Sequence, residues 1–333
     1  MNNAPKKISI KYFIILILVS VISTFFLTKR YITKSNESSN NLANSACNFE
    51  QKRIHGYKYI EPLLYVEQSC ESPLLENTKE EITKTIESYK AMSGVIEASV
   101  YLRDYQSNTW MNVNESILYE PGSLFKVPIL IAYLKMKEEN PTILNTEIKF
   151  ETPFSIDKNV AFKSKTIELG KKYTIRELLK YMIVYSDNNA TALLNNNLKP
   201  EILNKLFSDL NLEVPDVKSS HYFFTPQQYS LFMRCLYNAS YLTHDDSEFA
   251  ASLLSKSEFN KGIVRGLPKN TKLIHKFGES GNQVEKQLHE SAIIYIREKP
   301  YLLTVMTKGK DNETLSNLIA IFPPLFIIIL NRN

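Results

Sequence analysis

The stretch PGSLFKVPIL, residues 121–130, places Ser123 three residues before Lys126, between a Pro-Gly turn and an apolar run. This pattern predicts a helix that begins near Ser123 and continues to about Met136. The serine has two interpretations. It is either an ordinary N-cap residue or a nucleophile whose proton Lys126 accepts. Residues three apart share one helix face, so the lysine can reach the hydroxyl, but these ten residues alone leave both interpretations open.

Two further short motifs bear on that choice. S-D-N occurs once, at 186–188, directly after a predicted helix, and K-x-G occurs once, at 276–278, at the end of a predicted strand. Taken singly, the first is a polar turn and the second a strand-end lysine with a turn glycine. S-x-x-K itself occurs again at 155–158, in a polar stretch that shows no helix start. The order S-x-x-K, S-D-N, K-x-G on a helix start, a loop and a strand therefore favours the chemical interpretation of Ser123.

The pattern of apolar residues predicts an α+β fold. Residues 77–92 have helical spacing, and 140–258 are mainly helical, with a capping box from Thr174 to Glu177 at the start of one helix. Short apolar runs bounded by turns predict strands at 98–102, 109–113, 271–278, 291–296 and 301–307. About five mostly antiparallel strands thus come from both ends of the chain, with a helical subdomain at about 140–260 inserted between them.

Charge is concentrated at the N-terminus. The whole chain of 333 residues carries a net charge of +5. The first 36 residues hold six basic side chains and no acidic one, which leaves the remainder near neutrality at −1. A nucleic-acid-binding face needs a basic patch on the folded domain. The composition therefore does not indicate a nucleic-acid partner.

Residues 11–28 contain a run of 17 uncharged, mainly apolar residues, YFIILILVSVISTFFLT. That is the short end of the range for a membrane-spanning helix, and no small-x-small cleavage site follows it directly. We expect a membrane anchor at 11–28 with residues 1–10 in the cytoplasm, and a cleaved signal peptide is the alternative. Basic residues lie on both flanks, so we place the large domain outside the cytoplasm only because of the function expected below.

The regions beside the main domain are less informative. Residues 29–50 are predicted to be a polar tether, 51–322 the folded domain, and 323–333 an apolar tail after the Pro323-Pro324 pair, where a helix could end. Cys47 and Cys70 could form a disulfide in an extracytoplasmic domain, which leaves Cys235 as a buried free thiol. No Cys or His spacing suggests a metal site, and no cofactor is expected.

With its three motifs in this order, the chain resembles the penicillin-recognising serine enzymes, in particular class A β-lactamases and penicillin-binding proteins. The similarity extends beyond the motifs. GLPKNTKLIHKFGES (266–280) is similar to the family's third-motif strand, VYLRDYQSNTW (100–110) to its first hairpin, and FFTPQQYSLFMRCL (223–236) to the helix after its omega loop. The resemblance covers roughly residues 75–320. It implies a three-layer α/β/α domain with a five-stranded antiparallel sheet.

The resemblance also implies roles for individual residues. Ser123 is expected to be the acylated nucleophile, Lys126 its proton acceptor, and Ser186 a proton relay to the leaving group. Asn188 is expected to contact the substrate, and Lys276 to supply positive charge near Ser186 and the substrate carboxylate. Phe277, Gly278 and Glu279 would line the substrate side, and the N–H groups of Ser123 and Glu279 would form the oxyanion hole.

The proposed base has a physical requirement. Lowering the pKa of a lysine from about 10.4 to near neutrality costs about 4 kcal/mol. Burial and a neighbouring cation can supply this free energy, and Lys276 is the candidate cation.

Two departures from the family pattern concern substrate and turnover. Phe277 stands where the third motif has Ser or Thr, whose hydroxyl helps to hold a substrate carboxylate. Class A β-lactamases also carry a Glu-x-x-Leu-Asn pattern whose Glu activates the deacylating water. Between Leu210 and Thr225 this pattern is missing, and Glu213 and Asp216 are the only acids. His289 could face the site, but a satisfied strand histidine is the simpler expectation.

We therefore expect a serine hydrolase or acyltransferase that acts through an acyl-Ser123 intermediate on β-lactams or D-Ala-type cell-wall peptides, with slow deacylation. One alternative is a serine hydrolase of the same fold with another ester or amide substrate. A second alternative, from a different class, is a catalytically silent, membrane-tethered binding module. The expected partners are a small-molecule or peptide substrate and the membrane.

Overall fold

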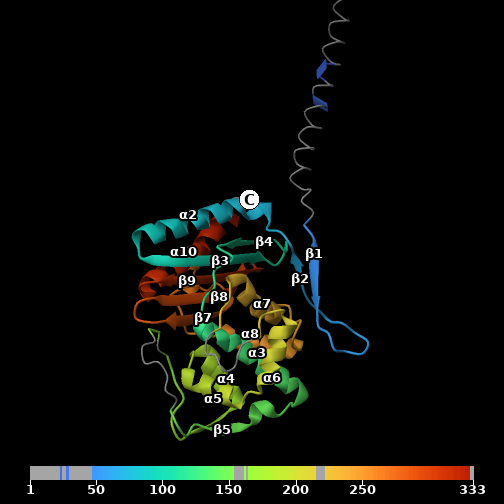
Figure 1. Ribbon diagram of the computed structural model, residues 1–333, viewed down its shortest axis with the longest axis vertical. Helices are drawn as coiled ribbons and strands as arrows, with labels where there is room; N and C mark the ends of the chain where they lie inside the picture. The colour runs from blue at the N-terminus through green and yellow to red at the C-terminus, as the bar shows by residue number, and fades with distance from the viewer. Residues whose placement is uncertain are drawn as a thin grey trace, which may run out of the picture. The chain divides into compact units, whose positions relative to one another are not determined.

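A five-stranded antiparallel sheet in the order β4-β3-β9-β8-β7 is the centre of the domain (Figure 1). In the computed structural model the described residues are 47–153, 161–162, 164–214 and 222–330, together with 23–24 and 28–29. The strands are β3 (Val95–Asp104), β4 (Trp110–Val113), β7 (Leu273–Gly281), β8 (Lys286–Ile296) and β9 (Lys299–Gly309). Strand β3 pairs with β9 in register Val100↔Val305, so the sheet joins the two ends of the domain. The α+β prediction is confirmed.

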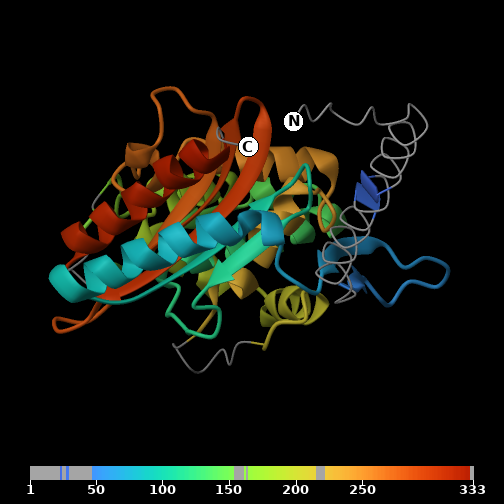
Figure 2. The ribbon, with the colours of Figure 1, turned by 90° about the horizontal axis from the view of Figure 1, so that it is seen from above.

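Helices cover both faces of this sheet. Helices α2 (Glu76–Met92) and α10 (Asn312–Leu330) lie side by side on one face (Figure 2). Helix α7 (Pro226–Tyr237) packs on the other face, and most of the remaining helices gather below it (Figure 1). In β9, Leu302 and Met306 join the core on the α7 side, whereas Leu303 and Val305 join the core on the α10 side. A strand buried on both faces reads as a continuous apolar run, which explains the predicted strands.

The inserted helical block also agrees with the prediction. The helices between residues 140 and 260 are α4 (Ile175–Val184), α5 (Asn188–Asn197), α6 (Pro200–Asp209), α7 and α8 (His244–Leu254). Helix α3 (Lys126–Glu139) precedes them and packs against α4 and α6, and the single turn α9 (Ile263–Gly266) follows them and packs on α10. The same segment holds a two-stranded sheet of β5 (Glu147–Lys149) and β6 (Lys172–Thr174) and the short turn η3 (Ile143–Asn145), whereas the turns η1 (Pro73–Leu75) and η2 (Gly122–Phe125) come before α2 and α3. The predicted capping box is present: the Thr174 side chain accepts from the Glu177 N–H, and the Glu177 carboxylate accepts from the Thr174 N–H.

An N-terminal hairpin was missed by the sequence analysis. Strands β1 (Phe49–Arg53) and β2 (Leu63–Gln68) pair antiparallel, so regular structure begins inside the segment 29–50 that was expected to be tether. Cys47 and Cys70 are disulfide-bonded, and Cys235 is free and buried, in accord with the expectation.

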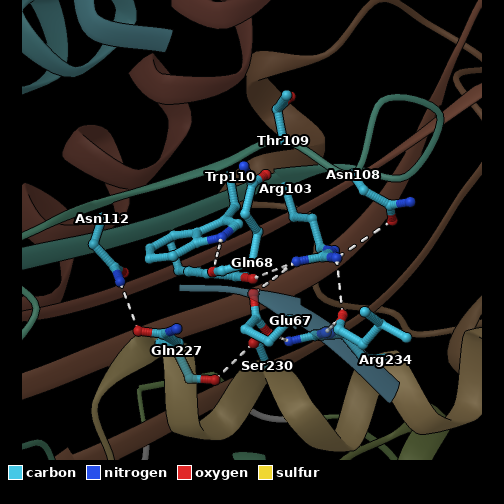
Figure 3. A network of polar contacts seen from close by, with 12 residues as sticks. Glu67, Gln68, Arg103, Asn108, Thr109, Trp110, Asn112, Gln227, Ser230 and Arg234 are labelled. Carbon is cyan, nitrogen blue, oxygen red and sulfur yellow. Dashed lines mark hydrogen bonds and ion pairs between the residues drawn. The ribbon is translucent and has the colours of Figure 1, made fainter. Parts of the chain in front are cut away.

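A buried ion network fastens β2 to the main sheet and to α7 (Figure 3). The Glu67 carboxylate accepts from Arg103 Nη1 at 2.9 Å and from Arg234 Nη1 of α7. Both guanidinium groups also donate to the Val66 carbonyl. Only 4% and 2% of the two arginine side chains are exposed. Since an isolated buried charge is costly, one carboxylate between two arginines fixes the position of β2.

Helix α10 contradicts the expectation that a helix ends at the prolines and that 323–333 form a separate tail. The helix continues through Pro323 and Pro324 to Leu330. Pro324 cannot donate to the Ala320 carbonyl one turn earlier. Helix α9 packs at this point: a Cβ added to Gly266 would lie 2.0 Å from the Ala320 oxygen. Phe326 beyond the prolines is buried in the core. Tertiary packing therefore outweighs the local loss of hydrogen bonds.

The predicted anchor at 11–28 falls almost wholly outside the described residues, so it stays a prediction. Within the described part of the chain, no helix has both the length and the apolar character needed to cross a bilayer.

The ion network at Glu67 gives a stability prediction. Glu67→Gln leaves two buried guanidinium groups without an anion, and we expect the free energy of unfolding to fall by about 3–5 kcal/mol. Urea unfolding followed by the fluorescence of Trp110, the chain's single tryptophan, measures this. Glu71→Gln is the matched control, since the Glu71–Lys79 pair is partly exposed and should cost less than about 1 kcal/mol. Equal effects of the two variants would contradict the prediction.

Candidate active site

Two glycines bring the turn that carries Ser123 into contact with the edge strand β7. Gly278 of β7 lies so close that an added Cβ would be 2.2 Å from the Pro121 carbonyl oxygen. Gly122 has a φ of +52°, and its added Cβ would be 2.2 Å from the Glu279 carbonyl oxygen. Any side chain at either place would separate the two segments. The contact sets Ser123, on η2 immediately before α3, beside the backbone of Glu279.

His289 of β8 holds the same turn from behind. Its Nε2 lies 2.9 Å from the Glu120 carbonyl oxygen, and its Nδ1 accepts from the Thr307 N–H at 3.1 Å. This arrangement fits a neutral ring that donates through Nε2, and burial lowers the pKa of His289 to about 4. His289 is fully buried. It is the satisfied strand histidine of the simpler expectation, and it positions the chain two residues before Gly122.

Lys126 is buried and faces three oxygen atoms. Its Nζ lies 2.6 Å from the Ser186 carbonyl oxygen, 3.1 Å from Ser186 Oγ and 2.6 Å from Asn188 Oδ1. Only 3% of the residue is exposed. Burial lowers the pKa of Lys126 to about 7, against the opposing effect of the Asp187 carboxylate. Near neutral pH a large fraction of this lysine is therefore an uncharged amine that can accept a proton.

The turn between α4 and α5 delivers Ser186 in an uncommon conformation. Ser186 has a φ of +54°, a region that non-glycine residues rarely adopt. Asp187 stabilises the turn: its carboxylate accepts from the N–H of Asn189, the N–H of Ile167 and the Thr166 hydroxyl. The sequence analysis gave Asp187 no role of its own. The S-D-N motif thus combines two residues at Lys126 with one that holds their backbone.

Lys276 reaches the same hydroxyl from the sheet. Its Nζ lies 2.9 Å from Ser186 Oγ and 3.0 Å from the Phe277 carbonyl oxygen, and the side chain is fully buried. Burial and the repulsion from Lys126 lower the pKa of Lys276, while the Glu290 carboxylate acts in the opposite direction. The structure therefore joins both predicted lysines through the one hydroxyl of Ser186.

A pocket of about 910 Å³ opens above these groups. Ser123, Lys126, Ser186 and Asn188 line it, and so do the predicted substrate-side residues Phe277 and Glu279. Lys276 and Gly278 are buried in its wall. Further lining residues that the sequence analysis did not identify are Glu120, Phe125, Phe162, Tyr222, Ser280, Asn282, Gln283 and Lys286. The predicted site residues thus converge on one pocket, although their positions span more than 150 residues of sequence.

Comparison with known proteins agrees with this geometry. The family model described as the β-lactamase enzyme family matches residues 77–321. The chain belongs to the β-lactamase enzyme family.

Several solved structures share the fold of this chain. PBP-A is 19% identical, with a TM-score of 0.65 over 78% of this chain and 97% of its own. A β-lactamase from Xanthomonas campestris pv. campestris is 18% identical, with a TM-score of 0.63 over 76% and 98%. A variant of the last common ancestor of class A β-lactamases of Gram-negative bacteria is 18% identical, with a TM-score of 0.65 over 77% and 99%. No curated protein sequence matches the chain. These identities show a shared fold.

Phe277 departs from the β-lactamase family pattern in a defined way. Its ring stacks on Phe259 with centroids 4.2 Å apart, and Phe162 meets both rings edge-on. Lys276 Nζ lies 4.2 Å from the centroid of the Phe277 ring. The position that carries a hydroxyl elsewhere in the family is here part of an aromatic cluster.

Of the two predicted omega-loop acids, the structure describes only Glu213, which does not line the pocket. Glu213 is exposed and is not among the lining residues, and Asp216 lies outside the described residues, as does the second S-x-x-K at 155–158. The described carboxylates that line the pocket are Glu120 and Glu279. In the part of the chain that the structure describes, no three His, Cys, Asp or Glu side chains are grouped to hold a metal ion.

The close contact at Gly278 predicts a large effect of one methyl group. In Gly278→Ala the added Cβ meets Pro121 and Leu124 and displaces the Ser123 turn, so the rate of Ser123 labelling by a fluorophosphonate should fall by about 100-fold or more. Gly56→Ala is the control for backbone strain alone: Gly56 has a φ of +101°, which alanine adopts at a cost, but nothing lies within 4 Å of its added Cβ, so its labelling rate should stay within about twofold of wild type. A folded Gly278→Ala protein that labels at the wild-type rate would refute this role of the contact.

Proposed function

We propose that the protein is a serine hydrolase or acyltransferase that works through an acyl-Ser123 intermediate. The observation that carries the proposal is the Lys126 amine, which is buried, has a pKa of about 7 and lines the same pocket as Ser123, three residues earlier in the chain. A serine hydroxyl needs such a base to become a nucleophile. Lys276 and Lys126 are hydrogen-bonded to the same Ser186 hydroxyl, and the repulsion between their charges disfavours protonation of both lysines near neutral pH.

In the proposed reaction Ser123 Oγ attacks the substrate carbonyl carbon and its proton passes to Lys126. The N–H groups of Ser123 and Glu279 donate to the oxygen that becomes negative, a contribution of about 2.7–4 kcal/mol for each donor. The proton then moves through the Ser186 hydroxyl to the leaving nitrogen or oxygen, and the bond to the leaving group breaks. Water later adds its hydroxyl to the acyl group and returns its proton to Ser123 Oγ, which releases the acid.

We further propose that deacylation is slow. A water nucleophile needs a carboxylate or amine that can take its proton. Glu279 already accepts from the Ala161 N–H and from Asn312 Nδ2, and Glu120 accepts from the Ser280 hydroxyl. Glu213 is exposed away from the lining residues. These contacts support a long-lived acyl-enzyme.

The substrate classes that the sequence favours are β-lactams and D-Ala-type peptides. A variant of PBP-A, a protein of similar fold, has been solved as an acyl-enzyme complex with penicillin G, which supports this class. Phe277 in place of a hydroxyl supports the alternative of another ester or amide. A silent binding module is disfavoured, because burying two lysines around one serine hydroxyl costs free energy that mere binding does not need.

We also propose that residues 11–28 anchor the domain to a membrane and that the domain is extracytoplasmic. The disulfide-bonded Cys47 and Cys70 support this placement, because structural disulfides persist in oxidising compartments.

Covalent labelling tests the proposed function. We expect a fluorophosphonate to label the wild-type protein and not Ser123→Ala, because Ser123 is the proposed nucleophile, whereas the Ser186 hydroxyl accepts hydrogen bonds from both lysines. Any fluorescent penicillin adduct should depend on Ser123 and persist for hours. Mass spectrometry of the adduct locates the modified residue. A domain that forms no Ser123-dependent adduct with either reagent would be a binding module, and an adduct lost within seconds would exclude slow deacylation.

The pKa of Lys126 predicts the pH dependence of acylation. Only the neutral amine accepts the serine proton, so the labelling rate should rise with pH to a plateau, with a midpoint near the Lys126 pKa of about 7. Below the midpoint the rate should fall about tenfold per pH unit. Labelling rates between pH 5 and about pH 9, corrected for reagent hydrolysis, measure the profile. A midpoint near the usual lysine pKa, about 10.4, would show that Lys126 is not the base.

A further inference from the structure

Lys276, the buried lysine beside the pocket, has no N–H group left to donate to a ligand. A lysine ammonium has three N–H groups. Those of Lys276 face Ser186 Oγ at 2.9 Å, the Phe277 carbonyl oxygen at 3.0 Å and the Phe277 ring, whose centroid is 4.2 Å away. The ring satisfies part of the charge by a cation–π interaction. Lys276 therefore offers a substrate carboxylate no free hydrogen bond.

The neighbouring groups on β7 do not replace that donor. Position 277 has no hydroxyl, and the Ser280 hydroxyl donates to Glu120 Oε2 at 3.1 Å. Between them lies Glu279, an anion that lines the pocket and is held by Asn312 Nδ2 at 2.9 Å. A carboxylate brought to this strand would meet two glutamates and no available hydroxyl. Electrostatics on this side of the pocket thus oppose an anionic substrate group.

Aromatic rings form the adjoining walls. Phe277 and Phe162 belong to one cluster, whose rings meet at 5.9 Å. Phe125 and Tyr222 stack at 4.4 Å and line the same pocket. Aromatic walls bury apolar groups and, through their ring edges and faces, pack well against other aromatic groups. The other lining residues of the pocket are largely polar, so these rings provide the surface on which an uncharged alkyl or aryl group can pack.

Resting on the proposed acyl transfer at Ser123, we propose that the site selects esters or amides whose group next to Lys276 and Phe277 is an uncharged alkyl or aryl group. Substrates that carry a carboxylate there, which include penicillins and D-Ala-terminated peptides, are disfavoured, so the inference favours the alternative class of other esters or amides. The bonds that form and break are those of the proposed reaction, and the inference adds the chemical class of the substrate. Phe277 is the residue that determines this specificity, because its ring replaces a donor and covers the Lys276 ammonium.

Lys286 is the competing anion receptor. It lines the same pocket from the start of β8, so a carboxylate bound at Lys286 would reverse the preference. The experiment therefore includes a variant at this position.

The experiment compares two esters of phenylacetylglycine, one with a charged carboxylate on its leaving group and the other with the uncharged methyl ester of that carboxylate. One has a meta-carboxyphenyl leaving group and the other has its neutral methyl ester, meta-methoxycarbonylphenyl. We expect kcat/KM for the neutral ester to be higher by about tenfold or more, which corresponds to about 1.4 kcal/mol. Both rates are corrected for uncatalysed hydrolysis. A ratio below about tenfold, or a preference for the carboxylate, overturns the proposal.

Three variants test whether Phe277 or Lys286 determines the preference between the neutral and the charged ester. Phe277→Ser places a hydroxyl at position 277 and removes the ring from Lys276. The ratio of kcat/KM for the neutral ester to kcat/KM for the carboxylate ester should therefore fall by about tenfold or more. Phe277→Leu removes the ring without adding a donor, and this matched control should still prefer the neutral ester. Lys286→Gln should do so as well. If Phe277→Ser leaves the ratio of the two kcat/KM values unchanged, Phe277 does not determine the specificity. If the wild type prefers the carboxylate ester and Lys286→Gln abolishes that preference, Lys286 is the anion receptor and the proposal is overturned.

The design separates this inference from the proposed function. Fluorophosphonate labelling of Ser123 does not depend on a carboxylate, so loss of labelling in the wild type would count against acyl transfer itself. Normal labelling together with a carboxylate preference would count against the substrate class alone. The wild-type ratio needs no variant, so the result stands even if a Phe277 variant fails to fold.

Discussion

Two lysine Nζ atoms, 3.1 Å and 2.9 Å from a single serine hydroxyl, are the constraint on which the site depends. Lys126 and Lys276 are almost completely buried, and two positive charges held so close to one oxygen cannot both remain fully protonated in a low-dielectric interior. The protons of such a pair belong to the pair rather than to either member. Because both lysines cannot stay protonated, one of them is an uncharged amine at neutral pH and can act as a base.

The topology of the sheet is what brings these groups together. Lys126 begins α3, Lys276 lies on the edge strand β7, and Ser186 lies in the turn between α4 and α5 of the inserted helical block. The pairing of β3 with β9 brings the chain's C-terminal strands next to the β3–β4 hairpin. The missing side chains of Gly122 and Gly278 then allow β7 to touch the nucleophile turn. The motifs are distant in sequence because two lie at the ends of different helices and the third lies on the edge strand of the sheet.

The sequence predicted the parts of this arrangement that have a local pattern. Apolar runs marked the strands, Thr174 and Glu177 marked the start of α4, and three short motifs marked the site. Contacts without a local pattern were missed. Hairpin β1–β2 is held by Glu67 through arginines far along the chain, and α10 passes its prolines because Gly266 packs there. The covering of Lys276 by an aromatic cluster depends on Phe162 and Phe259, which no motif includes.

The molecule buries cations in two ways, and the choice of residue explains the difference. At the hairpin, Arg103 and Arg234 share the Glu67 carboxylate. A guanidinium stays protonated in proteins, so its burial requires an anion. At the pocket the buried cations are lysines, whose acceptors are carbonyl, amide and hydroxyl oxygens. A lysine can release its proton when no carboxylate is in direct contact. Exchanging the two residue types would remove the base from the pocket, because arginine in place of Lys126 would keep its proton at neutral pH.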